Sequence, residues 1–178
     1  MAPERKYQNK YRIETTRLAG WDYGSNALYY ITINTKNRGH YFGKIVDKEM
    51  HLTNVGLAAN DCWQEIPKHF SFVVLEKFVV MPDHVHGIIR INKPVGMDVE
   101  TQNFVSLPYK KNKFGPQSNN LASILRGYKI GVTNFAKSHN IFFCWQRGYH
   151  DHIIRNERSF YAISKYIENN PGKWDIGK

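Results

Sequence analysis

Hydrophobic residues recur along the chain with two periods, and each period predicts a type of element. Alternation of apolar and polar residues, or runs of β-branched residues, indicates strands, whereas recurrence every three to four residues indicates helices. The expected strands are residues 27–38, 70–81, 84–91 and 141–155, the last being a strand or a bent hairpin, and the expected helices are residues 52–70, 121–137 and 156–171. Asn156 and Pro171 give the last helix a capping residue and a stop.

This order of elements predicts an α+β fold of the ferredoxin-like, split βαβ type, in which helices lie on one face of an antiparallel sheet, with an extra C-terminal helix. With 178 residues, the chain is expected to form a single domain over residues 1–178. Two segments depart from the pattern. Residues 1–19 form a basic N-terminal arm, and prolines and glycines break any period in residues 93–118, which we expect to be a long flexible loop.

Composition narrows the functional classes. Hydrophobic residues make up 42% of the chain, which is enough for a core, and the formal charge of +10 points to a polyanion, either a nucleic acid or an acidic membrane surface. A basic protein without such a partner is the alternative. The two cysteines are isolated, and the sequence has neither a secretory leader nor an apolar run long enough to span a membrane. We therefore expect a soluble, cytoplasmic protein.

The segment "VVMPDHVHGIIRI" places two histidines at the start of an apolar strand. Side chains alternate along a strand, so His84 and His86 point to the same face and could chelate one divalent ion. The alternative is that His86 is hydrogen-bonded in the core and His84 is exposed near a turn. Two imidazoles alone make an incomplete metal site, so a third ligand is needed.

The last helix offers that ligand in the segment "KYIENNP". Tyr166 and Asn170 are four residues apart and are expected to share a helix face, which could close on the sheet. The alternative is that Tyr166 is a core residue, packed with the apolar residues of the same helix.

Together, "VVMPDHVHGII", "CWQRGYHDHIIRNE" and "YIENNP" resemble the HUH single-strand DNA transposases that use one catalytic tyrosine, and within them the REP-associated tyrosine transposase branch. The resemblance covers residues 20–175 in the same order, and the loop at 93–118 is the main departure. It implies a ferredoxin-like core, a divalent ion held by His84 and His86, and a nucleophile, Tyr166, on a C-terminal helix. Asn170 occupies the position of a third, amide ligand.

The chemistry of these residues agrees with the resemblance. A phenolate can attack a phosphodiester while Mg²⁺ or Mn²⁺ on the imidazoles polarises the phosphate. The tyrosine would become linked to a 5′-phosphate and leave a free 3′-OH, which preserves the bond energy for strand transfer. Two imidazoles and one amide suit a labile Mg²⁺ or Mn²⁺ better than a structural zinc. The expected protein is thus a metal-dependent single-stranded DNA endonuclease and transposase.

Other residues offer competing interpretations. His150 and His152 form a second alternating pair, in which His152 is a candidate DNA contact, and the alternative is an exposed His150 with an inward His152. Tyr128 is a second candidate nucleophile, although its place on the apolar stripe of its helix favours core packing. A histidine-triad hydrolase is a weaker reading of the first pair, because Ile88 stands where the third histidine would be.

Basic residues near aromatic ones are the candidates for DNA binding. They are Arg5, Lys6, Lys10 and Arg12 in the arm, Lys110 and Lys111 in the loop, and Arg126 and Lys129 in the helix at 121–137. The resemblance implies single-stranded or hairpin DNA as the partner, and the sequence is compatible with a monomer or a homodimer. The competing functional class is a catalytically inactive module that binds DNA or RNA hairpins.

Overall fold

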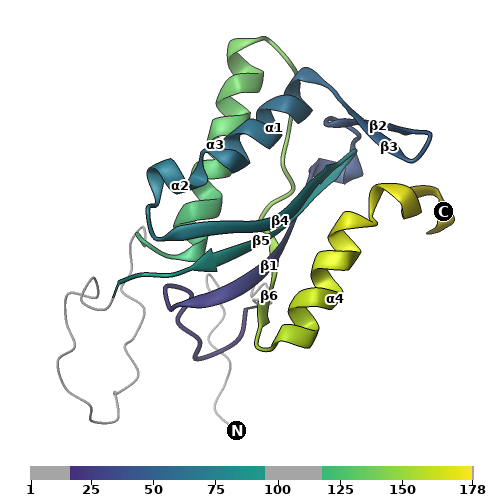
Figure 1. The fold of residues 1–178 in the computed structure, drawn as a ribbon. Coiled ribbons are helices and arrows are strands. Elements are labelled where there is room, and N and C mark those ends of the chain that lie inside the picture. Colours follow the sequence, from purple (N-terminus) through teal and green to yellow (C-terminus); the bar gives the residue numbers. More distant parts are fainter. Residues whose placement is uncertain (1–16, 95–117, 178) are drawn as a thin grey trace, which may run out of the picture.

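The protein, described by a computed structural model for residues 17–94 and 118–177, is built on one four-stranded antiparallel sheet (Figure 1). Its strands lie in the order β4-β5-β1-β6. Their bounds are β1, Ala27–Asn34; β4, Val73–Met81; β5, His84–Ile91; and β6, His150–Ile154. Both neighbours of β1 in this sheet are antiparallel to it, so the predicted antiparallel α+β fold is confirmed.

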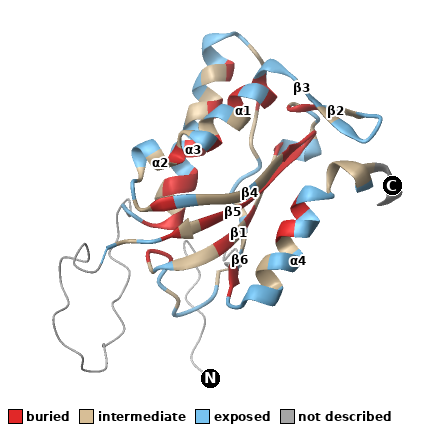
Figure 2. Ribbon diagram, viewed as in Figure 1, coloured by how far each residue is buried: buried red, intermediate tan, exposed pale blue. Residues whose placement is uncertain are grey.

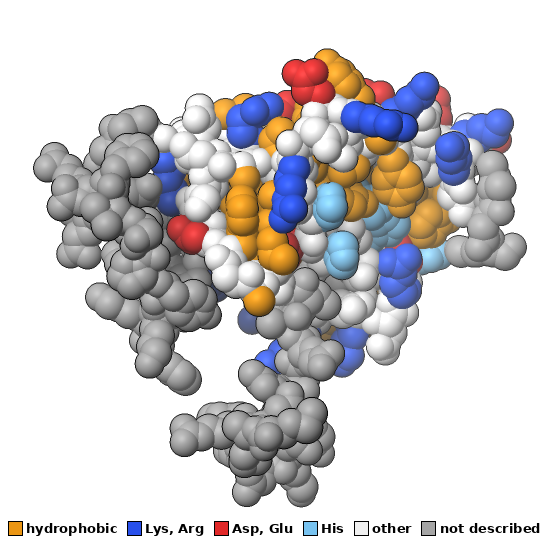
Figure 3. All heavy atoms as spheres, turned by 90° about the horizontal axis from the view of Figure 1, so that it is seen from below, with side chains coloured by type: hydrophobic (Ala, Val, Ile, Leu, Met, Phe, Trp, Pro, Cys, Tyr) orange, Lys and Arg blue, Asp and Glu red, His pale blue; other side chains and the backbone are white. Residues whose placement is uncertain are grey.

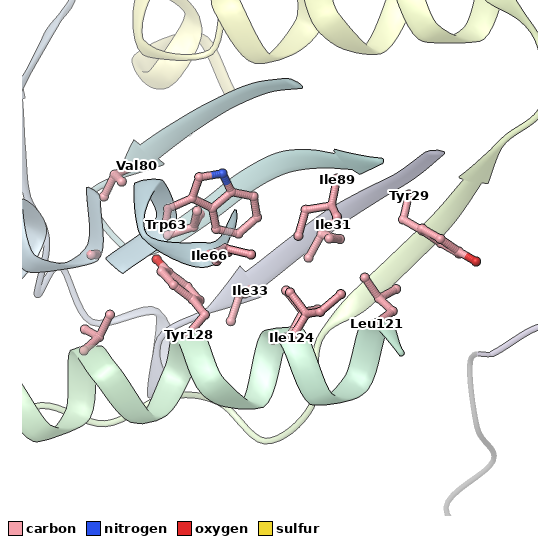
Figure 4. Close-up of a cluster of buried hydrophobic side chains, with 14 of the residues drawn as sticks. Tyr29, Ile31, Ile33, Trp63, Ile66, Val80, Ile89, Leu121, Ile124 and Tyr128 are labelled. Atoms are coloured by element: carbon pink, nitrogen blue, oxygen red, sulfur yellow. The ribbon is translucent and has the colours of Figure 1, made fainter. Parts of the chain in front are cut away.

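Helices α1 (Asn54–Gln64), α2 (Ile66–His69) and α3 (Leu121–Ser138) cover one face of the sheet (Figure 1). Between these helices and the sheet lies the main core, in which the indole of Trp63 meets isoleucines of β1 and β5 and the ring of Tyr128 (Figure 4). The residues labelled in Figure 4 are Tyr29, Ile31, Ile33, Trp63, Ile66, Val80, Ile89, Leu121, Ile124 and Tyr128. Side chains at odd positions of β1 and β5 supply the sheet side of this core, as strand alternation requires.

Helix α4 (Glu157–Glu168) packs on the opposite face of the sheet, and its inward side is buried while its outer side is exposed (Figure 2). Ile88, Ile154 and Ile167 form a second, smaller apolar cluster there. The helix begins where Asn156 predicts, because the Asn156 side chain accepts a hydrogen bond from the backbone N–H of Ser159 at 2.8 Å. The fold is therefore a three-layer arrangement in which the even-numbered side chains of β1 and β5 face α4.

A two-residue turn, Pro82 and Asp83, joins β4 to β5, and the register of the sheet then fixes what lies beside each residue of β5. His84 is paired with Asn34 of β1, and His86 is paired with Thr32. The next residue is Gly87, where a side chain would not fit because the indole of Trp63 lies against the backbone. A Cβ there would stand 2.2 Å from Cζ2 of the indole. The "HVHG" segment thus places its histidines on the α4 face and its glycine on the core face.

Several predicted bounds differ from the structure. The helix expected over 52–70 is interrupted at Glu65, and Pro67 lies in the first turn of the short α2 that follows. Most of the strand expected over 141–155 is irregular, because only β6 pairs as a strand. The pattern also missed the hairpin of β2 (Gly43–Val46) and β3 (Glu49–Leu52) and the 3₁₀ helices η2 (Lys36–Arg38) and η3 (Pro171–Gly177). These elements are too short for a period to emerge.

The residues that the structure describes contain no helix long and apolar enough to cross a membrane. The predicted arm over 1–19 and loop over 93–118 fall largely outside those residues, as do Arg5, Lys6, Lys10, Arg12, Lys110 and Lys111.

Candidate active site

Two histidines lie side by side at the start of β5, on the face that α4 covers. Each is only 5% exposed, and the centroids of their rings are 4.4 Å apart. Burial of both rings excludes the alternative in which His84 is exposed near a turn. Buried imidazoles need polar partners, so their hydrogen bonds decide what each ring nitrogen can do.

His84 is held through its Nδ1 atom, which lies 2.5 Å from Oδ1 of Asp83. The second carboxylate oxygen of Asp83 lies 3.0 Å from Nε of Arg38, and its carbonyl accepts hydrogen bonds from the backbone N–H and hydroxyl of Thr35, both at 2.9 Å. Burial alone would raise the pKa of Asp83, but the hydrogen bond to His84 and the charges of His84 and Arg38 outweigh it and lower the pKa. The carboxylate therefore fixes the ring and leaves Nε2 of His84 for a ligand.

His86 is also held through Nδ1, in this case by two hydroxyls of β1. Its Nδ1 atom lies 2.8 Å from the hydroxyl of Tyr30 and 2.9 Å from that of Thr32. Burial, followed by the nearby His84 and Arg38, lowers the pKa of His86 to about 3, so the ring is neutral at neutral pH. A proton on Nδ1, donated to these hydroxyls, leaves the lone pair of Nε2 free.

Tyr166 of α4 reaches this pair from the other side. Its hydroxyl lies 3.5 Å from Nε2 of His86, and the two ring centroids are 5.4 Å apart. The side chain is 52% exposed, which contradicts the alternative of a core tyrosine. Its neighbour Ile167 is the buried residue that anchors the helix. The hydroxyl thus lies where the buried imidazoles meet the surface.

The segment after α4 also borders the site, but not as the spacing predicts. The helix ends at Glu168, so Asn170 lies in the following turn, where its carbonyl accepts a hydrogen bond from the backbone of Lys173, rather than on a helix face shared with Tyr166. Further on, the indole of Trp174 stacks over His84 with centroids 5.9 Å apart. The role of Asn170 as a metal ligand stays a prediction.

The donor atoms of the site fit a divalent ion. Both imidazoles use Nδ1 for a protein partner, which is the usual arrangement of metal-binding histidines because it orients the ring and directs Nε2 to the metal. Among residues 17–94 and 118–177, no group of three or more His, Cys, Asp or Glu side chains could hold a metal. A site here would therefore rest on two imidazoles and a ligand of another type, such as an amide or water.

Comparisons with known proteins bear on the family and the fold of the chain. No protein-family model matches the chain. An uncharacterized protein of Haemophilus influenzae is 40% identical over 164 residues, which cover 89% of this chain and 88% of that protein, so the two belong to one family. A REP-associated tyrosine transposase, solved bound to a REP hairpin, has a TM-score of 0.55 and 18% identity over 98% of this chain and 75% of its own.

The chain has the fold of the REP-associated tyrosine transposases. The HUH resemblance read from the sequence is thereby confirmed at the level of the fold. In this HUH fold the sheet and α4 bring His84, His86 and Tyr166 together, as the sequence predicted.

Other predicted residues lie away from the histidines. Tyr128 is buried in the main core, where burial raises its pKa well above the usual value, so core packing is confirmed. Arg126 is exposed on α3, and Lys129 is half-buried, with Nζ donating to the carbonyls of Gln146 and Gly148. Lys129 therefore holds the loop before β6 in place. Its contact with DNA stays a prediction, as does that of Arg126.

His150 and His152 are both exposed, so the alternative of an inward His152 is wrong. They lie on the α4 face of β6, beside Thr32 and Tyr30.

Sequence reasoning missed the residues that hold the histidines. Asp83 precedes His84 directly, and an acidic residue beside the pair was a usable signal. Tyr30 and Thr32 carried no such signal, because only the register of β1 against β5 brings their hydroxyls to His86. Trp174 was missed because η3 has no hydrophobic period.

Proposed function

We propose that this protein is a metal-dependent single-stranded DNA endonuclease and strand transferase, a transposase in which Tyr166 is the nucleophile. The observation that carries the proposal is the position of the Tyr166 hydroxyl, 3.5 Å from Nε2 of a neutral, buried His86. A half-exposed phenol at this position can reach a phosphodiester that lies against the two imidazoles. A core tyrosine or a tyrosine on the outer side of α4 could not.

His84 and His86, through their Nε2 atoms, would hold Mg²⁺ or Mn²⁺, with Asn170 as a third ligand. When bound, the ion would polarise the scissile phosphate and stabilise the charge that develops on it. Asp83, Tyr30 and Thr32 would keep both rings oriented.

The reaction exchanges one phosphoester bond for another. The oxygen of Tyr166 forms a bond to phosphorus while the bond from phosphorus to the 3′ oxygen breaks, and the leaving oxygen takes up a proton to become a free 3′-OH. The 5′-phosphate stays on the tyrosine until a second 3′-OH attacks it and the strand is rejoined. If Nε2 of His86 binds the metal, it cannot also accept the phenol proton, so that proton leaves by another route.

The substrate class follows from charge and from the fold. A formal charge of +10 favours a polyanion, and the REP-associated transposase of the same fold was solved on a REP hairpin. We therefore propose hairpin DNA with single-stranded flanks as the substrate. Arg5, Lys6, Lys10, Arg12, Lys110, Lys111, Arg126, Lys129 and His152 are the proposed DNA contacts.

The proposal is tested with a labelled pool of hairpin oligonucleotides that carry random single-stranded flanks. Incubation with Mn²⁺ should produce a covalent protein–DNA adduct that survives denaturing electrophoresis, and EDTA should abolish it. Firm hairpin binding without an adduct would instead make the protein an inactive hairpin-binding module.

A further inference from the structure

The α4 face of the sheet has an uncovered strip, and β6 forms its outer edge. Helix α4 contacts β4, β5 and β6, and at β6 it buries Ile154. The two preceding residues on the same face of β6, His150 and His152, are exposed. Alternation along the strand therefore gives β6 one buried residue under α4 and two imidazoles that α4 leaves open to solvent.

This strip is continuous with the candidate active site through the register of the sheet. His150 is paired with Thr32 of β1, and Thr32 is paired in turn with His86 of β5. His152 is likewise paired with Tyr30, whose hydroxyl contacts His86. Since neighbouring strands lie about 4.8 Å apart, the β6 histidines are about 10 Å from the β5 strand that carries His86.

The surroundings of the strip suit a single strand of DNA, which is an anion. On this face β6 carries no acidic side chain, and Arg147, Arg155 and Arg158 around it are exposed. Figure 3 shows histidine side chains gathered in one area of the molecular surface, with lysine and arginine side chains around them. Imidazole N–H groups can donate to phosphate oxygens, and the rings offer stacking surfaces for unpaired bases.

We propose that His150 and His152 bind the single-stranded nucleotides next to the phosphate that Tyr166 attacks. This inference rests on the proposed function, since it assigns the path of the substrate at the same site. The single-stranded DNA would cross the sheet from the β6 edge, over Thr32 and Tyr30, to the imidazoles of β5.

Binding is best measured in the Tyr166→Phe protein, in which cleavage cannot remove the substrate. Two probes are compared, a DNA hairpin with a random single-stranded flank and the same hairpin without it. The variant His150→Ala/His152→Ala should bind the flanked hairpin about tenfold more weakly and the bare hairpin with unchanged affinity. The matched control is His69→Ala/His139→Ala, which removes two exposed histidines at the C-terminal ends of α2 and α3, on the face of the sheet opposite α4, and should change neither affinity.

Equal affinity of the double variant and its parent for the flanked probe would overturn the inference, as would an equal loss for both probes. Unchanged thermal unfolding of the variant establishes that a loss comes from binding. The proposed function fails separately: if the wild-type protein forms no covalent adduct, the proposed strand-transfer activity is wrong, whereas the comparison of flanked and bare probes still reports where the single-stranded DNA lies.

Discussion

The hydroxyl of Tyr166 lies 3.5 Å from Nε2 of His86, although 80 positions separate the two residues in the chain. Two packing relationships bring them together. Strand alternation turns His86 toward the α4 face, and burial of Ile167 sets the height and rotation of α4 over that face. The site is therefore assembled across the interface between the sheet and α4.

Asp83 should govern the affinity of the site for its metal. Because its carboxylate fixes Nδ1 of His84, the substitution Asp83→Asn should weaken Mn²⁺ binding by about 10- to 100-fold. Titration of free Mn²⁺ by electron paramagnetic resonance measures the change. Asp61→Asn, an exposed position on α1, is the matched control. Equal Mn²⁺ affinity of the Asp83 variant and the wild type would show that Asp83 plays no part in metal binding.

The two hydroxyls on His86 should act redundantly. Either Tyr30→Phe or Thr32→Val leaves one hydroxyl on Nδ1, so each single variant should keep most of the Mn²⁺ affinity, whereas the double variant should lose about tenfold or more. Thr133→Val, which removes a hydroxyl from α3, controls for the loss of a hydrogen bond elsewhere. Additive, small losses in the double variant would show that the hydroxyls do not orient the ring.

Gly87 should be required for the packing of the strand that carries the histidines. A Cβ at this position would stand 2.2 Å from the indole of Trp63, so Gly87→Ala should lower the free energy of unfolding by roughly 1–3 kcal/mol. Urea denaturation measures the loss. Gly127→Ala on α3 is the control, because the nearest atom to its Cβ would be 3.8 Å away, and it should leave stability equal or slightly higher. A neutral Gly87→Ala would mean that Trp63 can shift.

Acid should destabilise the metal-free protein through His86. Its pKa is about 3 in the folded protein, below the ordinary value of about 6.5, so the unfolded chain binds the extra proton between these values. The contribution of His86 to the free energy of unfolding is fully present above about pH 6.5. It falls as the pH drops toward 3, by up to about 1.4 kcal/mol per pH unit. The lowered pKa of Asp83 acts in the same direction at lower pH. The free energy of unfolding, measured by urea denaturation, should differ less between pH 7 and pH 5 in His86→Gln than in the wild type.

Much of the fold could be predicted because its long elements have clear periods. The strand at 84–91 has the predicted bounds, and α3 differs from its prediction by one residue. It was harder to predict which face of the sheet each helix covers, since no local pattern indicates that α4 packs opposite α1 and α3. The β2–β3 hairpin was missed because its strands are only four residues long, which is too short for a period to emerge.

Some residues of the candidate site could likewise be predicted from the sequence and others could not. His84 and His86 could be paired from their spacing alone, because alternation holds in any strand. The partners of His86 could not, since Thr32 is 54 positions away and its place depends on the register of β1. Asn170 was expected on a helix face, but the helix ends first at Glu168.

The most direct test of the central claim is to locate the DNA on the protein. After reaction with the hairpin pool and Mn²⁺, nuclease digestion and peptide mass spectrometry should find the residual nucleotide on Tyr166. Tyr161→Phe, which removes a 67% exposed tyrosine from the same helix, should still form the adduct, and Tyr166→Phe should not. A nucleotide on any other residue, or an adduct that persists in Tyr166→Phe, would contradict the account.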